Sequence, residues 1–163
     1  MSDIRIEALP GDYSNDDVYE NVLGYIGGKS YIGGFGFTCN PNISIIEQFR
    51  LSEIYSSHSS SKKIWHFILT FSTSWNHLEL LKLAAVIARG FSSEYQILFG
   101  LDTEQGRPHL HFGVNIFSYH PSHPVLSEEK MLNYLTQLQD YLKKIYPAMT
   151  VTLQFLRKGG QNV

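Results

Sequence analysis

Two histidines separated by a single residue stand out in the stretch DTEQGRPHLHFGVN, residues 102–115. Side chains alternate faces along a β-strand, so His109 and His111 should point the same way, about 6–7 Å apart. Leu110 and Phe112 should then point to the opposite face. Two imidazoles on one face of a strand can bind one metal ion, provided that a third ligand comes from a neighbouring element.

The nearest candidate for that third ligand is a carboxylate. If residues 95–101 pair with 109–117 as a hairpin, Asp102 lies at the end of the adjacent strand, and Glu104 is a less favoured alternative. An oxygen ligand suits Mg²⁺ or Mn²⁺, whereas imidazoles favour Zn²⁺ or Ni²⁺ in vitro. The alternative is that the two histidines are simply buried and hydrogen-bonded in a structural domain.

The elements that must position these residues follow from the periodicity of the chain. Apolar stripes at helical spacing, with Asn76 and Ser127 as N-caps, predict two helices. Runs of β-branched and aromatic residues predict four strands. The predicted strands are 64–71, 95–101, 109–117 and 149–156, and the predicted helices are 76–91 and 127–146. The resulting order is β-α-β-β-α-β, which predicts an α/β (α+β) fold with a ferredoxin-like core and an antiparallel sheet. The two helices should cover one face of this sheet, with the two histidines on the other.

The N-terminal part of the chain is less regular. Residues 3–9 favour an additional strand and residues 15–26 a short helix, while residues 27–42 suggest a glycine-rich loop or hairpin. Residues 52–63 are polar and are expected to form a mobile connection. We therefore expect residues 1–163 to form one domain, with an N-terminal segment (1–62) followed by the core (63–156).

Composition excludes several classes of protein. The 163 residues are 43% hydrophobic, which is typical of a globular domain. No apolar run approaches the ~20 residues that cross a bilayer, and the acidic N-terminus does not resemble a signal peptide. The lone Cys39 cannot form an internal disulfide, which fits a reducing cytosol. The formal net charge of −2 argues against an extensive basic DNA-binding surface.

Three segments resemble the HUH endonucleases, and specifically the conjugative relaxases of the MobP type. KKIWHFILTFS resembles their first core strand, and YQILFGLDTEQGRPHLHFGVN resembles their metal-binding hairpin. NVLGYIGGKSYIGGFGFTCNPN is similar to their N-terminal segment, in which a Tyr-Ile pair precedes a lysine. Together the similar segments span roughly residues 20–156.

The resemblance implies an activity. Relaxases nick single-stranded DNA at the transfer origin of a plasmid or mobile element in the bacterial cytoplasm, with or without accessory transfer proteins. A tyrosine attacks the scissile phosphate and becomes joined to the 5′ end, while a divalent cation held by histidines polarises the phosphate. The position of the family's nucleophile matches Tyr25, and its metal ligands match His109, His111 and Asp102. Such a chain would be a minimal nuclease domain or a remnant.

The chain also departs from the family, and this leaves alternatives open. Asp102 replaces the usual third histidine, which favours either a retuned metal site or a degenerate, binding-only or regulatory relative. Tyr31 is a second candidate nucleophile. Tyr141 is a third, because YLKK resembles the motif of rolling-circle replication initiators. We read His66 as structural and the loop residues His120 and His123 as solvated. The basic residues that could contact phosphates are Arg50, Lys62, Lys63, Arg89, Arg107, Lys143, Lys144, Arg157 and Lys158.

Overall fold

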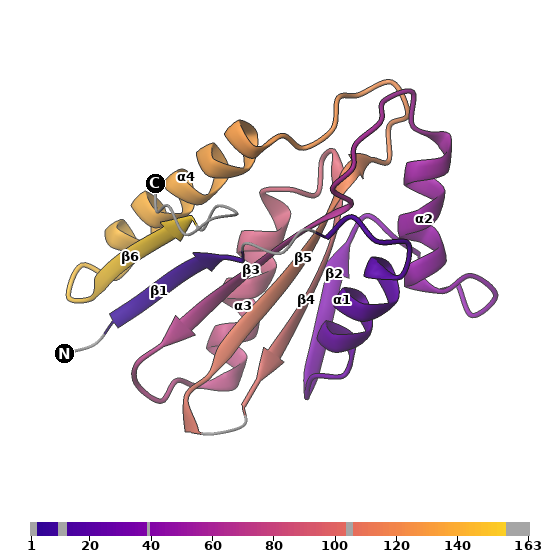
Figure 1. The fold of residues 1–163 in the computed structure, drawn as a ribbon. Coiled ribbons are helices and arrows are strands. Elements are labelled where there is room, and N and C mark those ends of the chain that lie inside the picture. Colours follow the sequence, from indigo (N-terminus) through magenta and orange to yellow (C-terminus); the bar gives the residue numbers. More distant parts are fainter. Residues whose placement is uncertain (1–2, 10–12, 39, 104–105, 156–163) are drawn as a thin grey trace.

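In the residues that the structure describes, the chain has an α+β fold in which four helices pack on a six-stranded mixed sheet (Figure 1). This computed structural model describes residues 3–9, 13–38, 40–103 and 106–155. The strands are β1 (Asp3–Ala8), β2 (Tyr31–Phe35), β3 (Ile64–Phe71), β4 (Tyr95–Asp102), β5 (His109–Ser118) and β6 (Thr150–Phe155). The helices are α1 (Val18–Gly27), α2 (Ile45–Tyr55), α3 (His77–Arg89) and α4 (Glu128–Ile145). No helix in the described part of the chain combines the length and apolar character needed to cross a membrane.

The strands lie in the order β2-β4-β5-β3-β1-β6. All neighbouring strands are antiparallel except β1 and β6, which are parallel. The expectation of a purely antiparallel sheet was therefore wrong. β1 lies between β3 and β6, and its Ile4, Ile6 and Ala8 are buried in the main core.

The two faces of the sheet bury different sets of residues. On β5, Leu110, Phe112 and Val114 belong to the main core, which α3 and α4 cover. The intervening residues face α1 and α2, and Gly113 lies against Ile26 of α1. Figure 1 shows α1 in front of the sheet and α3 behind it. The predicted arrangement, with both core helices on the face opposite the histidines, is confirmed.

All six predicted elements of the core are confirmed within a residue or two. The expected N-terminal strand and short helix are also present, as β1 and α1. The glycine-rich segment 27–42 is different, since it contributes the edge strand β2, which pairs with β4.

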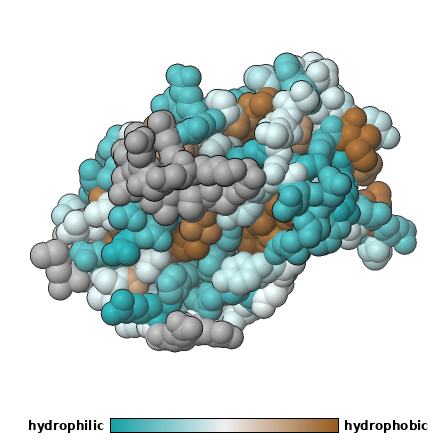
Figure 2. All heavy atoms as spheres, viewed as in Figure 1, coloured by the Kyte–Doolittle hydropathy of each residue, from teal (hydrophilic) through white to brown (hydrophobic). Residues whose placement is uncertain are grey.

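Helix α2 was not predicted, and its last turn occupies the start of the segment 52–63 that we expected to be a connection. The sequence signal for α2 is a capping box. The Ser44 side chain accepts a hydrogen bond from the Glu47 backbone amide, and the Glu47 side chain accepts one from the Ser44 backbone amide. The helix leaves Leu51, Ile54 and Tyr55 exposed. Figure 2 shows hydrophobic residues at the surface at this end of the molecule.

Glycine allows α1 to lie close to the sheet. An added Cβ at Gly100 on β4 would lie 2.7 Å from the Ile26 carbonyl oxygen and 3.0 Å from Cγ of Lys29. In the sheet, Gly100 is directly opposite His111. The end of α1 is thereby brought next to the histidines.

We expect Gly100→Ala to destabilise the fold by about 1–3 kcal/mol, because the methyl group overlaps the α1 backbone. The matched control is Gly24→Ala within α1, where a Cβ meets nothing within 4 Å. Helix propensity should make that variant more stable by about 0.5–1 kcal/mol. Urea denaturation measures both free energies of unfolding. A Gly100→Ala protein as stable as wild type would show that the close approach is not required.

Candidate functional site

His109 and His111 lie on the same face of the central strand β5, and their ring centroids are 6.3 Å apart. His111 is buried, with 5% of its surface exposed, whereas His109 is half-buried at the end of the strand. The spacing agrees with the same-face geometry expected from the sequence.

A third histidine joins them. His66 on β3 is opposite Gly113, and its Nε2 lies 3.4 Å from Nδ1 of His111. On its other side, Nδ1 of His66 lies 3.4 Å from the Tyr13 hydroxyl. Sequence reasoning read His66 only as a buried structural residue. Its place beside His111 depends on the register of β3 against β5, which no local pattern specifies.

Burial keeps the inner two histidines neutral. It is the main reason that the pKa of His66 falls to about 4, with smaller contributions from His111 and the Lys29 charge. The pKa of His111 is also lowered to about 4, first by burial and then by the Lys29 charge. Near pH 7 both side chains are therefore uncharged imidazoles. In that form a histidine can accept a proton or bind a metal.

Lys29, just after the end of α1, brings a positive charge to this group. Its Nζ lies 3.0 Å from Oδ2 of Asp102 and 3.9 Å from the centroid of the Tyr25 ring. Burial lowers the pKa of Lys29, but the Asp102 carboxylate and the Tyr25 phenol outweigh it, so the pKa is raised. Lys29 is therefore a charged ammonium, and only 15% of its side chain is exposed.

Asp102 occupies the place expected for a third metal ligand, directly opposite His109 across the hairpin. Its carboxylate, however, is already paired with the Lys29 ammonium. Like charges about 4 Å apart near a protein surface repel by about 4 kcal/mol, so a cation on Asp102 would be opposed by Lys29. In this arrangement Asp102, His109 and His111 do not form a site that suits a divalent ion. Over the described ranges, no three histidine, cysteine, aspartate or glutamate side chains are grouped to hold one. Glu104, the alternative ligand, lies outside the described residues.

Tyr25 lies over the histidines. Its ring centroid is 5.3 Å from that of His111 and 6.3 Å from that of His66, both in edge-on geometry. Half of Tyr25 (51%) is exposed. A residue far from the histidines in sequence is thus placed beside them, with access to solvent.

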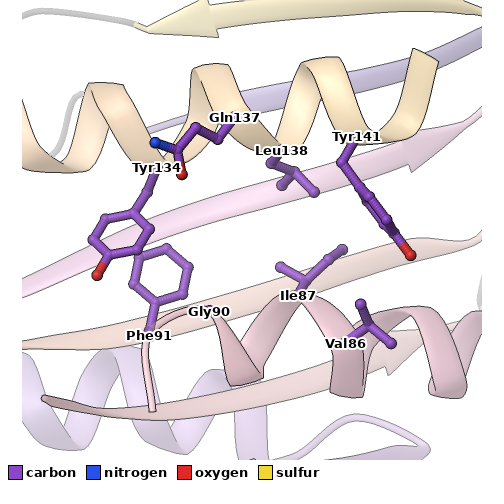
Figure 3. Close-up of a pocket in the computed structure, with 8 residues that line it drawn as sticks. All are labelled: Val86, Ile87, Gly90, Phe91, Tyr134, Gln137, Leu138 and Tyr141. Carbon is purple, nitrogen blue, oxygen red and sulfur yellow. The ribbon is translucent and has the colours of Figure 1, made fainter. Parts of the chain in front are cut away.

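The two rival tyrosines lie on the other face of the sheet. Tyr31 is opposite Leu101, a residue of the main core, and its ring lies beside His77 of α3. Tyr141 on α4 lines a pocket with Leu138 and with Ile87 of α3 (Figure 3). Neither side chain shares the face that carries the histidines.

Four of the basic residues that could contact phosphates are paired with carboxylates or lie away from the histidines. Arg50 pairs with Glu20, and Lys63 pairs with Glu53 at 2.7 Å. Lys143 and Lys144 are in the last turn of α4, which packs on the opposite face. Arg157 and Lys158 lie outside the described residues. Arg50, Lys63, Lys143 and Lys144 therefore do not line a shared basic groove beside the histidines.

The loop histidines make a separate small cluster. The rings of His120 and His123 are 4.6 Å apart, and Nε2 of His120 lies 3.2 Å from the Ser93 carbonyl oxygen. Both side chains are exposed. Their position in a surface loop agrees with the interpretation as solvated residues.

Comparison of the chain with protein-family models, curated proteins and solved structures finds no match.

The neutral histidines should make stability depend on pH. The pKa of His66 is about 4 in the folded protein and near 6.5 when unfolded, so the unfolded chain takes up the proton first as pH falls. Stability is therefore complete above pH 6.5 and is lost as pH falls toward 4. From pH 7 to pH 5 we expect His66 to account for a loss of about 1–2 kcal/mol.

Urea denaturation at the two pH values measures this loss. His66→Gln cannot titrate and should lose correspondingly less stability than wild type. His120→Gln, a change in the exposed loop, serves as the control and should keep the pH dependence of wild type. If wild type and His66→Gln lose the same free energy, burial does not hold His66 neutral.

Proposed function

We propose that this chain is a relaxase-like endonuclease of the HUH type, which nicks single-stranded DNA with Tyr25 as the nucleophile. Its substrate would be a transfer origin of a plasmid or other mobile element in the bacterial cytoplasm. The observation that carries the proposal is the position of Tyr25, whose half-exposed ring lies 5.3 Å from that of His111. The resemblance to relaxases implies that the segment with Tyr25 lies beside the strand with His109 and His111.

The strand order also supports the proposal. When β1 and β2 are set aside, the remaining strands follow the order β4-β5-β3-β6. This is the strand order of a ferredoxin-like β-α-β-β-α-β core. In this interpretation, β1 and β2 are additions from the N-terminal segment, and that segment also carries the nucleophile across the sheet on α1.

The reaction needs a nucleophile, proton transfer and a cation at the scissile phosphate. The Tyr25 oxygen forms a bond to the scissile phosphorus, while the bond from phosphorus to the 3′ oxygen breaks. The phenol must lose a proton; the His66 and His111 imidazoles lie next to its ring, but a pKa of about 4 makes both weak bases at neutral pH, so the proton passes to solvent at the half-exposed Tyr25. The leaving 3′ oxygen takes up a proton, and negative charge on the phosphate is met by a nearby cation. The 5′ phosphate stays joined to Tyr25, so the strand can be resealed.

One observation favours a second candidate, a binding-only relative that has lost nicking. Asp102 is held by Lys29 at 3.0 Å, so the ligand set of an active relaxase is not assembled. Such a protein would bind single-stranded DNA over the same face without forming a covalent bond.

A covalent capture assay distinguishes the two candidates. Wild-type protein is incubated with labelled single-stranded oligonucleotides of random sequence, with and without Mn²⁺, and adducts are sought on a denaturing gel. We expect wild type to form an adduct and Tyr25→Phe to form none, since only the hydroxyl is removed.

Tyr31→Phe and Tyr141→Phe are the matched controls, and both should keep full yield because their rings lie across the sheet. An adduct that persists in Tyr25→Phe and disappears in Tyr141→Phe would identify a replication-initiator arrangement instead. If wild type binds DNA but forms no adduct, the binding-only candidate is correct.

A further inference from the structure

We propose that Lys29 is the resident cation of this site, and that its ammonium holds the place a divalent ion would take beside Asp102. This deepens the proposed function, because it assigns the cation that meets the phosphate. Its central test, however, is a binding measurement that needs neither DNA nor activity.

The position of Lys29 is built into the fold. The backbone amide of Lys29 donates to the Ile26 carbonyl oxygen at 3.1 Å, which fixes the residue at the turn that ends α1. Its aliphatic stem then lies flat on β4, where a Cβ at Gly100 would be 3.0 Å from Cγ and 3.1 Å from Cβ of Lys29. The path of the side chain therefore depends on the absence of a side chain at Gly100. A surface lysine with a free choice of rotamers would show no such constraint.

The surroundings of the ammonium are those of a bound cation. A carboxylate oxygen of Asp102 lies 3.0 Å away, and the face of the Tyr25 ring lies 3.9 Å away. Both favour a positive charge, the first by ion pairing and the second by a cation–π contact. Both charged side chains are largely shielded from solvent, with 15% of Lys29 and 17% of Asp102 exposed. His109, the outer histidine, is directly opposite Asp102 in the hairpin.

An ammonium in this position can do part of what a metal does. It carries one positive charge and donates hydrogen bonds, and lysine binds phosphate as a point charge. Unlike a metal ion, it cannot be removed by a chelator. It also raises the cost of placing a second cation at Asp102, so the wild-type site should bind divalent ions weakly.

Titration of Mn²⁺ into the protein by calorimetry tests the proposal. Lys29→Met keeps most of the stem and removes the charge that opposes a cation at Asp102, across the hairpin from His109. We expect its Mn²⁺ affinity to exceed that of wild type at least tenfold. Lys29→Arg keeps the charge and should bind as weakly as wild type. Lys82→Met removes an exposed lysine on α3 and serves as the control for net charge.

Two further measurements make the result specific. Adding Asp102→Asn to Lys29→Met should abolish the gain, and Mn²⁺ should broaden the NMR signals of His109 and His111 in Lys29→Met alone. Lys29→Gln provides a second uncharged side chain if the Met variant folds poorly. Equal Mn²⁺ affinity in wild type and both uncharged variants would overturn the proposal, whether that affinity is strong or weak.

The catalytic consequence is tested in the covalent capture assay. We expect wild type to form the Tyr25 adduct in excess EDTA, and Lys29→Met to form it only when Mn²⁺ is added. An adduct that wild type forms only with Mn²⁺ would overturn the assignment of Lys29 as the working cation. If no adduct forms under any condition, the proposed nicking fails, but a gain of Mn²⁺ affinity in Lys29→Met still establishes Lys29 as the resident cation.

Discussion

The candidate site depends on how closely α1 can approach the sheet. Gly113 on β5 meets Ile26, and Gly100 on β4 meets the Ile26 carbonyl oxygen and the stem of Lys29. A side chain at Gly100 would push away the end of the helix, and with it the two residues that reach the histidines from above. Tyr25 and Lys29 can take these positions because Gly100 and Gly113 have no side chains. The geometry of the site is set by the packing of a helix on a sheet, and the functional side chains follow from it.

The arrangement also gives the site an unusual electrostatic balance. The two inner histidines are neutral, and the Lys29 and Asp102 charges largely cancel each other at long range, so the ammonium acts only on a group that contacts it. The net charge of the chain is −2, and other basic residues such as Lys63 are paired with carboxylates. A nucleic acid would therefore gain little from long-range attraction. Binding to such a surface has to rely on contacts at short range, such as stacking on the exposed Tyr25 ring.

Local patterns were sufficient to predict the core elements. The apolar stripes of α3 and α4 and the His109–His111 alternation on β5 are properties of single segments, so they could be read from the sequence. The site depends equally on contacts between segments far apart in the chain. His66 is next to His111 only because of strand register, and Lys29 reaches Asp102 only because β4 carries a glycine opposite His111. Helix α2 was missed for a different reason: its Ser44 and Glu47 capping box is a local signal, but the helix buries only Phe49 and Ser52 and so has no apolar stripe.

The position of β1 has a consequence for how the chain folds. β6 does not pair with β3, because β1 lies between them and pairs with Thr150 of β6 through Asp3. The last described strand therefore joins the sheet only through the first. Contacts between residues this distant in sequence form slowly, because the intervening chain must first be ordered. The core strands β3, β4 and β5 are neighbours in sequence and can assemble early. Until β6 joins, the β1 edge of the sheet has unpaired backbone groups that another chain could pair with.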